Sequence, residues 1–186
     1  SILLISGGIY GMIKEIEKYK VKHIDYLEKN AELISVAQTL GLSLTSENTR
    51  TILTDPHRFI SKTNNRYDVA LINVPNPVNV QINRYYTLEF FARLKNILKK
   101  DGIACLSLDG SENYLGEEAI DLHSILFYTL DSVFNNVLII PGTRNYFLVS
   151  DNLISLDIPE LINKKEIVNN YINSDHIDVS SLKLRN

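Results

Sequence analysis

The chain has 186 residues, of which 45% are hydrophobic and 22% are charged, and its formal net charge is −3. This size and composition are typical of one soluble globular domain. The lysines and arginines are scattered along the chain, which argues against a nucleic-acid-binding face. No apolar run reaches the roughly 18 residues of a membrane span.

In the first half of the chain, short apolar runs alternate with helical patterns. We expect strands at residues 2–5, 23–27, 51–54 and 68–73. Apolar residues at helical spacing predict helices at 12–19 and 33–40, the second ending near Gly41. A shorter helix is expected around Phe59 and Ile60.

The second half begins with a long helical pattern at 90–98, which Asp101-Gly102 is expected to end. A strand follows at 103–108 and a further helix at 122–133. Residues 137–140 and 146–149 are two strand patterns too close together for a helix between them, so Pro141-Gly142 predicts a hairpin turn. A weak helical stretch near 161–171 follows.

Alternating strands and helices predict an α/β fold with a mostly parallel sheet covered on both faces. The closing hairpin adds an antiparallel strand. Together these features indicate a seven-stranded, Rossmann-like sheet of the class I S-adenosylmethionine methyltransferase type. We expect residues 1–150 to form this domain and residues 151–186 to form a C-terminal extension packed on it.

Open parallel sheets bind ligands beyond the carboxyl ends of their strands. The turn containing Gly7, Gly8 and Gly11 follows the first strand and precedes a helix, so its backbone can approach a ligand closely. Glu28 comes just after the second strand, about 20 residues beyond the glycine turn, a spacing that suits an acid binding ribose hydroxyls. A tight glycine turn without a ligand and a plain surface acid are the structural alternatives.

Two further segments follow the third and fourth strands. Asp55 could accept a hydrogen bond from an adenine amino group, or cap the helix that Pro56 begins, and the two roles are compatible. Asn73 and Asn76 lie in the segment NVPNP, where the reacting atoms of such folds lie; a plain proline-rich turn is the alternative. The four histidines show no metal-ligand spacing, so no metal is expected.

These segments resemble those of the spermidine and spermine synthases, the polyamine aminopropyltransferases. The glycine turn is similar to the family's GGGDGG, IDYLEKNAELI to its second-strand pattern, and TDPHRFI to its GD(G/A)xxF segment. The longest likeness is NVPNP with YYTLEFFARLKNILKKDGI, which resembles DxPDP with LYTxEFYxxLKxxLKPGGI. The resemblance covers about residues 2–150 and is nearest to synthase-like domains of larger, membrane-attached bacterial proteins.

The resemblance implies that the chain binds S-adenosylmethionine or its decarboxylated form, the donor from which the family moves an aminopropyl group to an amine such as putrescine. It gives cofactor-binding roles to a set of five residues and makes three others candidates for catalysis. The first set is Gly7, Gly8, Gly11, Glu28 and Asp55, and the second is Asn73, Asn76 and Tyr86.

Three of the family's acids are replaced in this chain, by Ile9, Asn73 and Asn76. A protonated amine has no lone pair with which to attack, and asparagine is no useful base. We therefore expect an adenosyl-binding domain with weak or lost aminopropyl transfer. An N-methyltransferase and a non-enzymatic domain of a larger protein remain alternatives.

Two sequence features bear on the cellular setting, the start of the chain and its cysteine content. The chain starts at Ser1 directly before a strand pattern, which suggests a fragment of a longer polypeptide. Cys105, the single cysteine, is expected to be a small core residue that forms no internal disulfide. We expect a cytoplasmic location, with any membrane attachment made through a missing part of the polypeptide, and leave a polyamine and a homodimer as open partners.

Overall fold

The computed structural model describes residues 1–186 except 20, 43, 45, 111–115 and 169–186. The strands are β1 (Ile2–Ile5), β2 (Ile24–Glu28), β3 (Thr49–Leu53), β4 (Tyr67–Ile72), β5 (Leu98–Asp109), β6 (Asn136–Ile140) and β7 (Arg144–Ser150). The α-helices are α1 (Met12–Glu17), α2 (Ala31–Thr39), α3 (Pro56–Lys62), α4 (Val80–Asn83), α5 (Leu88–Ile97), α6 (Glu117–Asp131) and α7 (Ile158–Lys164). Two 3-10 helices are η1 (Gly8–Tyr10) and η2 (Arg84–Tyr86).

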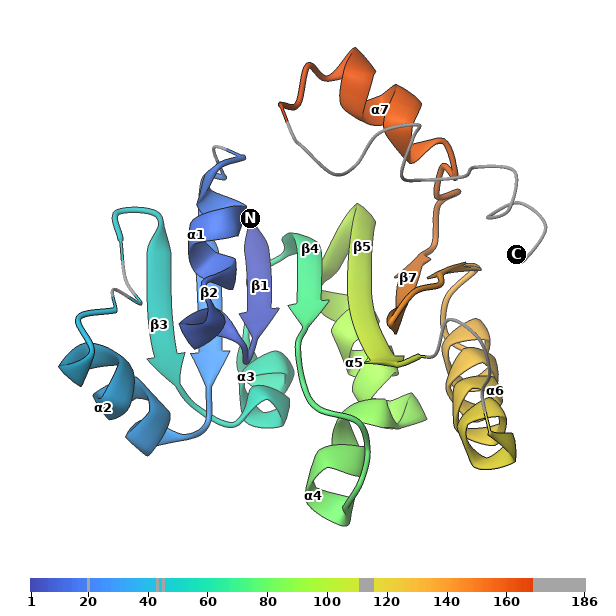
Figure 1. The fold of residues 1–186 in the computed structure, drawn as a ribbon, viewed down its shortest axis with the longest axis horizontal. Coiled ribbons are helices and arrows are strands. Elements are labelled where there is room, and N and C mark those ends of the chain that lie inside the picture. Colours follow the sequence, from blue (N-terminus) through green and yellow to red (C-terminus); the bar gives the residue numbers. More distant parts are fainter. Residues whose placement is uncertain (20, 43, 45, 111–115, 169–186) are drawn as a thin grey trace.

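The strands form one sheet in the order β3-β2-β1-β4-β5-β7-β6, with helices on both faces (Figure 1). β1 to β5 are parallel, whereas β7 is antiparallel to both β5 and β6. This confirms the predicted mostly parallel sheet with its closing hairpin. The strand order reverses between β1 and β4, so a ligand crevice is expected where these two strands end.

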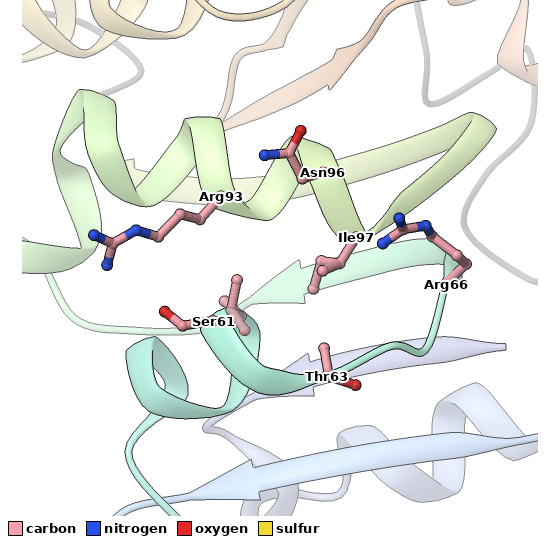
Figure 2. A pocket seen from close by; sticks show the side chains of 7 residues that line it. Ser61, Thr63, Arg66, Arg93, Asn96 and Ile97 are labelled. Carbon is pink, nitrogen blue, oxygen red and sulfur yellow. The ribbon is translucent and has the colours of Figure 1, made fainter.

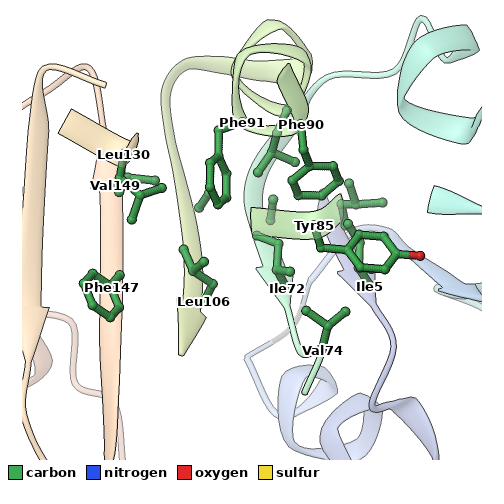
Figure 3. Close-up of a cluster of buried hydrophobic side chains, with 14 of the residues drawn as sticks. Ile5, Ile72, Val74, Tyr85, Phe90, Phe91, Leu106, Leu130, Phe147 and Val149 are labelled. Atoms are coloured by element: carbon green, nitrogen blue, oxygen red, sulfur yellow. The ribbon is translucent and has the colours of Figure 1, made fainter. Parts of the chain in front are cut away.

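Two hydrophobic cores hold the helices against the sheet. The larger core packs α5 and α6 onto one face, with Phe90, Phe91 and Phe147 among its buried rings (Figure 3). The smaller core lies under α1 and α2 and includes the fully buried Tyr26. Because the central strands are buried on both faces, they read as continuous apolar runs such as Ile2–Ile5.

The first differences from the sequence prediction concern α5 and β5. The Thr87 side chain caps α5 by accepting from the N–H of Phe90, and the helix already ends at Ile97. β5 begins at Leu98, so Asp101-Gly102 lies inside the strand and does not end a helix. A register shift between β4 and β5 accommodates this early start, which periodicity alone does not reveal.

The other differences are short helices. α4 follows β4 and is capped by the side chain of Asn79, which accepts from the N–H of Ile82. α7 ends at Lys164, within the predicted stretch 161–171, of which residues 169–171 lie outside the described part. None of the helices in the described residues is long and apolar enough to cross a bilayer.

The start of the C-terminal extension is tied to β5. The Asn152 amide donates to the carbonyl of Lys100 at 3.2 Å, and Ser150 Oγ donates to the carbonyl of Gly102 at 2.9 Å. The division of the chain at residue 150 stays a prediction.

Candidate functional site

The glycine turn after β1 has a backbone that few side chains tolerate. Ser6, Gly7 and Gly11 have φ values of 62°, 79° and 87°, in the left-handed region that favours glycine. A Cβ atom on Gly7 would overlap the side-chain amide of Asn73, whereas one on Gly11 would meet open space. The turn after β1 and the loop after β4 are therefore in direct contact, as expected at the point where the strand order reverses.

Alanine substitutions at these two glycines separate backbone strain from steric overlap. Gly11→Ala should cost about 1–2 kcal/mol, because a left-handed backbone disfavours a Cβ atom. Gly7→Ala should cost about 1 kcal/mol more, since it also pushes the Asn73 side chain aside. Urea unfolding of both variants measures the difference, and equal losses would contradict the contact between the turn and Asn73.

Glu28, the last residue of β2, is buried with only 5% of its surface exposed. Its Oε1 accepts from the backbone N–H groups of the next two residues at 2.9 and 3.0 Å. Its Oε2 accepts from the Tyr26 hydroxyl at 2.9 Å and from the Ser6 hydroxyl at 3.3 Å. These four donors fill the acceptor capacity of a carboxylate, so a ribose hydroxyl could bind by replacing the long Ser6 contact.

The ring of Tyr26 explains the glycine at position 8. A Cβ atom on Gly8 would lie 2.6 Å from this ring, so the turn can pass over the phenol only without a side chain. The Tyr26 ring thus packs against the glycine turn, while its hydroxyl orients the Glu28 carboxylate.

A cavity of about 560 Å³, a shallow depression largely open to solvent, lies beside Glu28. It extends along the beginning of α2 and is bordered by Gln81 of α4, which lies at the carboxyl edge of the sheet (Figure 1). This volume falls within the range of small-molecule sites. The residues around it therefore leave room for a nucleoside-sized ligand next to the acid predicted to bind ribose.

Asp55 caps α3, since its Oδ1 accepts from the N–H of His57 at 2.9 Å. Its carboxylate is also held by both terminal nitrogens of Arg84, at 2.9 and 3.3 Å, and Lys29 lies 3.9 Å away. The predicted cap is confirmed. These three hydrogen bonds leave one acceptor position on Oδ2, so an adenine amino group could donate to Asp55 beside Arg84 or in its place.

His57 lies between this ion pair and the large core. Its ring centroid is 5.3 Å from that of Tyr85 and 4.9 Å from that of Phe90. Its Nε2 is buried without a hydrogen-bond partner among the described residues. Burial, together with the nearby Arg84 charge, lowers the pKa of His57, so the imidazole is neutral at pH 7 and packs as an aromatic ring.

Asn76 joins the loop after β4 to the end of β5. Its Nδ2 donates to Asp109 Oδ2 and its Oδ1 accepts from the Asp109 N–H, both at 3.1 Å. Arg144 Nη1 lies 2.7 Å from Asp109 Oδ1 on the other side. The amide can serve one carboxylate and one N–H group at once, which an aspartate in its place could not do.

Tyr86 lies in η2, the 3-10 helix before α5, and binds the loop after β4 that carries Asn73 and Asn76. Its hydroxyl donates to the carbonyl oxygens of Val74, at 3.4 Å, and Pro75, at 2.9 Å. Burial raises the pKa of Tyr86 to about 12, so the phenol keeps its proton as a donor. The hydroxyl thereby positions the loop that carries both asparagines.

Ile9, at the position where the resemblance places an acid, is half-buried and packs against the core under α1 and α2. An isoleucine here supplies neither charge nor hydrogen bond to a ligand.

A second cavity, of about 290 Å³, lies between α3 and α5 beside the start of β4 (Figure 2). Arg66 and Arg93 come from its two sides, and the view shows their side chains around the groove with Ser61, Thr63 and Asn96. Since it adjoins the amino end of β4, it is separate from the crevice that the sequence predicts.

Across the described ranges, His, Cys, Asp and Glu side chains form no group of three or more that could hold a metal ion.

Comparison with known proteins decides the family. The model of the spermine/spermidine synthase domain matches residues 1–142. The chain belongs to the spermine/spermidine synthase family. Among its relatives, the polyamine aminopropyltransferase of Methanocaldococcus jannaschii is 28% identical over 108 residues, covering 55% of this chain and 36% of the relative. That of Sulfolobus acidocaldarius is 26% identical over 145 residues, covering 74% and 46%. The chain therefore spans less than half the length of either enzyme.

Solved structures show the same fold. A spermidine synthase in complex with the transition-state analogue AdoDATO superposes with a TM-score of 0.73 at 20% identity, covering 94% of this chain and 63% of the synthase. Human methyltransferase-like protein 13 in complex with SAH has a TM-score of 0.68 at 17% identity, covering 95% and 88%. The first of these structures holds AdoDATO and the second holds SAH.

The structure thus brings the glycine turn into contact with Asn73 and places Glu28 beside a large cavity. Asp55 and Asn76 lie at the same edge but are engaged by side chains that sequence reasoning missed. Arg84 engages Asp55 and Asp109 engages Asn76, while Tyr26 engages Glu28 and Arg144 engages Asp109. Asp109 and Arg144 stand at strand ends, whereas Tyr26 lies within β2 and Arg84 in η2, positions that carry no such sequence signal.

Proposed function

We propose that this domain binds an adenosyl ligand, S-adenosylmethionine or its decarboxylated form, and transfers an aminopropyl group weakly or not at all. The observation that carries the proposal is the cavity of about 560 Å³ beside the buried Glu28, in a chain whose family acts on such ligands. The glycine turn and the ribose acid are retained, while Ile9, Asn73 and Asn76 stand where the family's acids are expected.

The residues present fit the adenosyl group with two adjustments. Ribose can donate to Glu28 in place of Ser6, whose 3.3 Å contact is the longest of the four. Adenine can donate to Asp55 at the acceptor position of Oδ2 that Arg84 leaves, or after Arg84 moves. Arg84 is partly exposed and can rotate into solvent, so the ion pair hinders the ligand without closing the site.

Calorimetry with S-adenosylmethionine, decarboxylated S-adenosylmethionine and methylthioadenosine tests the proposal. Glu28→Ala should weaken binding by about 1–3 kcal/mol, because the ribose hydroxyls lose their acceptor. Glu28→Gln keeps one acceptor oxygen and should weaken it less. Glu118→Ala is the control, since Glu118 is exposed on α6 and does not line the cavity, so the affinity should stay unchanged.

The same calorimetry distinguishes the two alternative functions, an N-methyltransferase and a non-enzymatic domain. Binding of S-adenosylmethionine in preference to its decarboxylated form would favour an N-methyltransferase, which the similarity in fold to human methyltransferase-like protein 13 keeps open. Absence of binding by all three compounds to folded protein would favour a non-enzymatic domain and contradict the proposal.

A further inference from the structure

A small cavity of about 110 Å³ lies on the face of the sheet that carries α1. Met12, the first residue of α1, forms one wall, and β4, β5 and β7 supply the others. The lining residues are Met12, Leu71, Ile72, Asn73, Cys105, Leu106, Ser107 and Tyr146. No role for this space follows from the sequence, which predicts only that Cys105 is a core residue.

The cavity adjoins the glycine turn after β1. Asn73 lines it and also packs against Gly7 of the glycine turn. Met12 directly follows Gly11, the last residue of that turn. A group seated in the cavity is therefore separated from the glycine turn by one side chain, the amide at the position of a family acid.

The chemistry of the lining decides what can bind. None of the eight residues is a carboxylate, and most of the wall is carbon or sulfur. Burial raises the pKa of Cys105 to about 11, so the thiol is neutral at pH 7. Ser107 Oγ accepts from Arg144 Nε at 3.1 Å, which brings a positive charge close to the cavity. Asp109 pairs with Arg144 and balances that charge, so a buried ammonium would find no free counter-ion among the described lining residues.

We propose that this cavity takes a small neutral, apolar group, the alkyl end of a second substrate or ligand, and excludes the ammonium group of a polyamine. Its role as a second-substrate site rests on the proposed adenosyl binding, whereas its preference for neutral groups does not. An engineered cavity of 150 Å³ lined by apolar side chains holds benzene, so a volume of 110 Å³ suits roughly four carbon atoms.

The chain supplies two reporters for the test, because Met12 is its only methionine and Cys105 its only cysteine. The ¹³C-labelled Met12 methyl group gives a single NMR signal, and the rate at which a thiol reagent modifies Cys105 reports access. The probes are butan-1-ol and putrescine, which share a four-carbon chain and differ in charge. Butan-1-ol should shift the Met12 signal and, at ten times its dissociation constant, slow Cys105 modification about tenfold.

Putrescine at the same concentration should do neither. Leu71→Phe, which fills the cavity, should abolish both butan-1-ol effects. Val69→Phe is the matched control on the same face of β4, two residues before the cavity, and should leave them unchanged.

Three results would overturn the proposal: putrescine acting as strongly as butan-1-ol, no effect of either probe, or a Cys105 thiol that is unreactive in the ligand-free protein because another segment covers it. None of these three results depends on the calorimetry with adenosyl compounds. A failure of adenosyl binding together with a positive butan-1-ol result would refute the proposed function and leave the cavity's preference standing.

Discussion

Replacing Asp25 with alanine is expected to lower the free energy of unfolding by about 3 kcal/mol, the lower end of the cost of breaking a buried charge pair. Asp25 lies in β2 with none of its side chain exposed. Its Oδ1 is 2.8 Å from Arg50 Nη2 and 2.9 Å from His23 Nε2, and its Oδ2 accepts from the Tyr67 hydroxyl at 2.6 Å. The lower end applies because Arg50 and His23 are about half-exposed and can be rehydrated.

The loss should depend on pH. Burial alone would raise the pKa of Asp25, but the hydrogen bonds from Tyr67, Arg50 and His23 outweigh it and hold the pKa below its ordinary value. A lowered folded-state pKa contributes stability above the unfolded value of about 3.9. This contribution is lost as the pH falls through the folded pKa, so the variant and the parent should converge in strong acid.

Asp68→Ala is the matched control for urea unfolding at pH 7. Asp68 also accepts from a charged donor, Lys99 at 2.7 Å, but about half of its side chain is exposed. Exposed pairs are worth about 0–1 kcal/mol, so this variant should be nearly as stable as the parent. Similar losses for both variants would show that burial does not govern the Asp25 cluster.

The fold could be predicted from the sequence because its signals are local. Strand patterns, helical spacing and the short Pro141-Gly142 gap each depend on a few neighbouring residues, and together they indicated the parallel sheet and the hairpin. The start of β5 at Leu98 escaped prediction because it depends on pairing with Tyr67, 31 residues earlier, across a register shift.

The site was predictable only where the fold fixes a position. Glu28 could be placed at the crevice because it ends β2, next to the strand that carries the glycine turn. The partners of Asp55 and Asn76 could not be, since Arg84 and Asp109 are 29 and 33 residues away and reach them through side-chain conformations. The spacing of residues in the sequence does not predict such side-chain contacts. The hydrogen bonds of Asp55 with Arg84 and of Asn76 with Asp109 are seen only in the structure.

The second large effect concerns catalysis. We expect the unmodified chain to convert putrescine and decarboxylated S-adenosylmethionine to spermidine at a rate at least about 100-fold below the typical enzyme range of 1–10³ per second. The reason is that general-base assistance contributes roughly 10²–10⁴-fold, and the loop after β4 offers amides at Asn73 and Asn76. Release of methylthioadenosine, followed by chromatography, measures the rate. Turnover within the typical range would show that another base serves the acceptor.

The structure separates the two asparagines as targets for restoring the acid. Asn73→Asp keeps the size of the side chain against Gly7 and places a carboxylate between the glycine turn and the apolar cavity. It should strengthen putrescine binding by about tenfold or more, the value of a hydrogen bond to a charged group. Asn76→Asp should give no such gain, because the new carboxylate would face Asp109 Oδ2 at about the 3.1 Å now bridged by an amide donor. Calorimetry with putrescine compares the two variants, and an equal or larger gain from Asn76→Asp would mean that Asp109 turns away and that the acceptor amine binds beside β5.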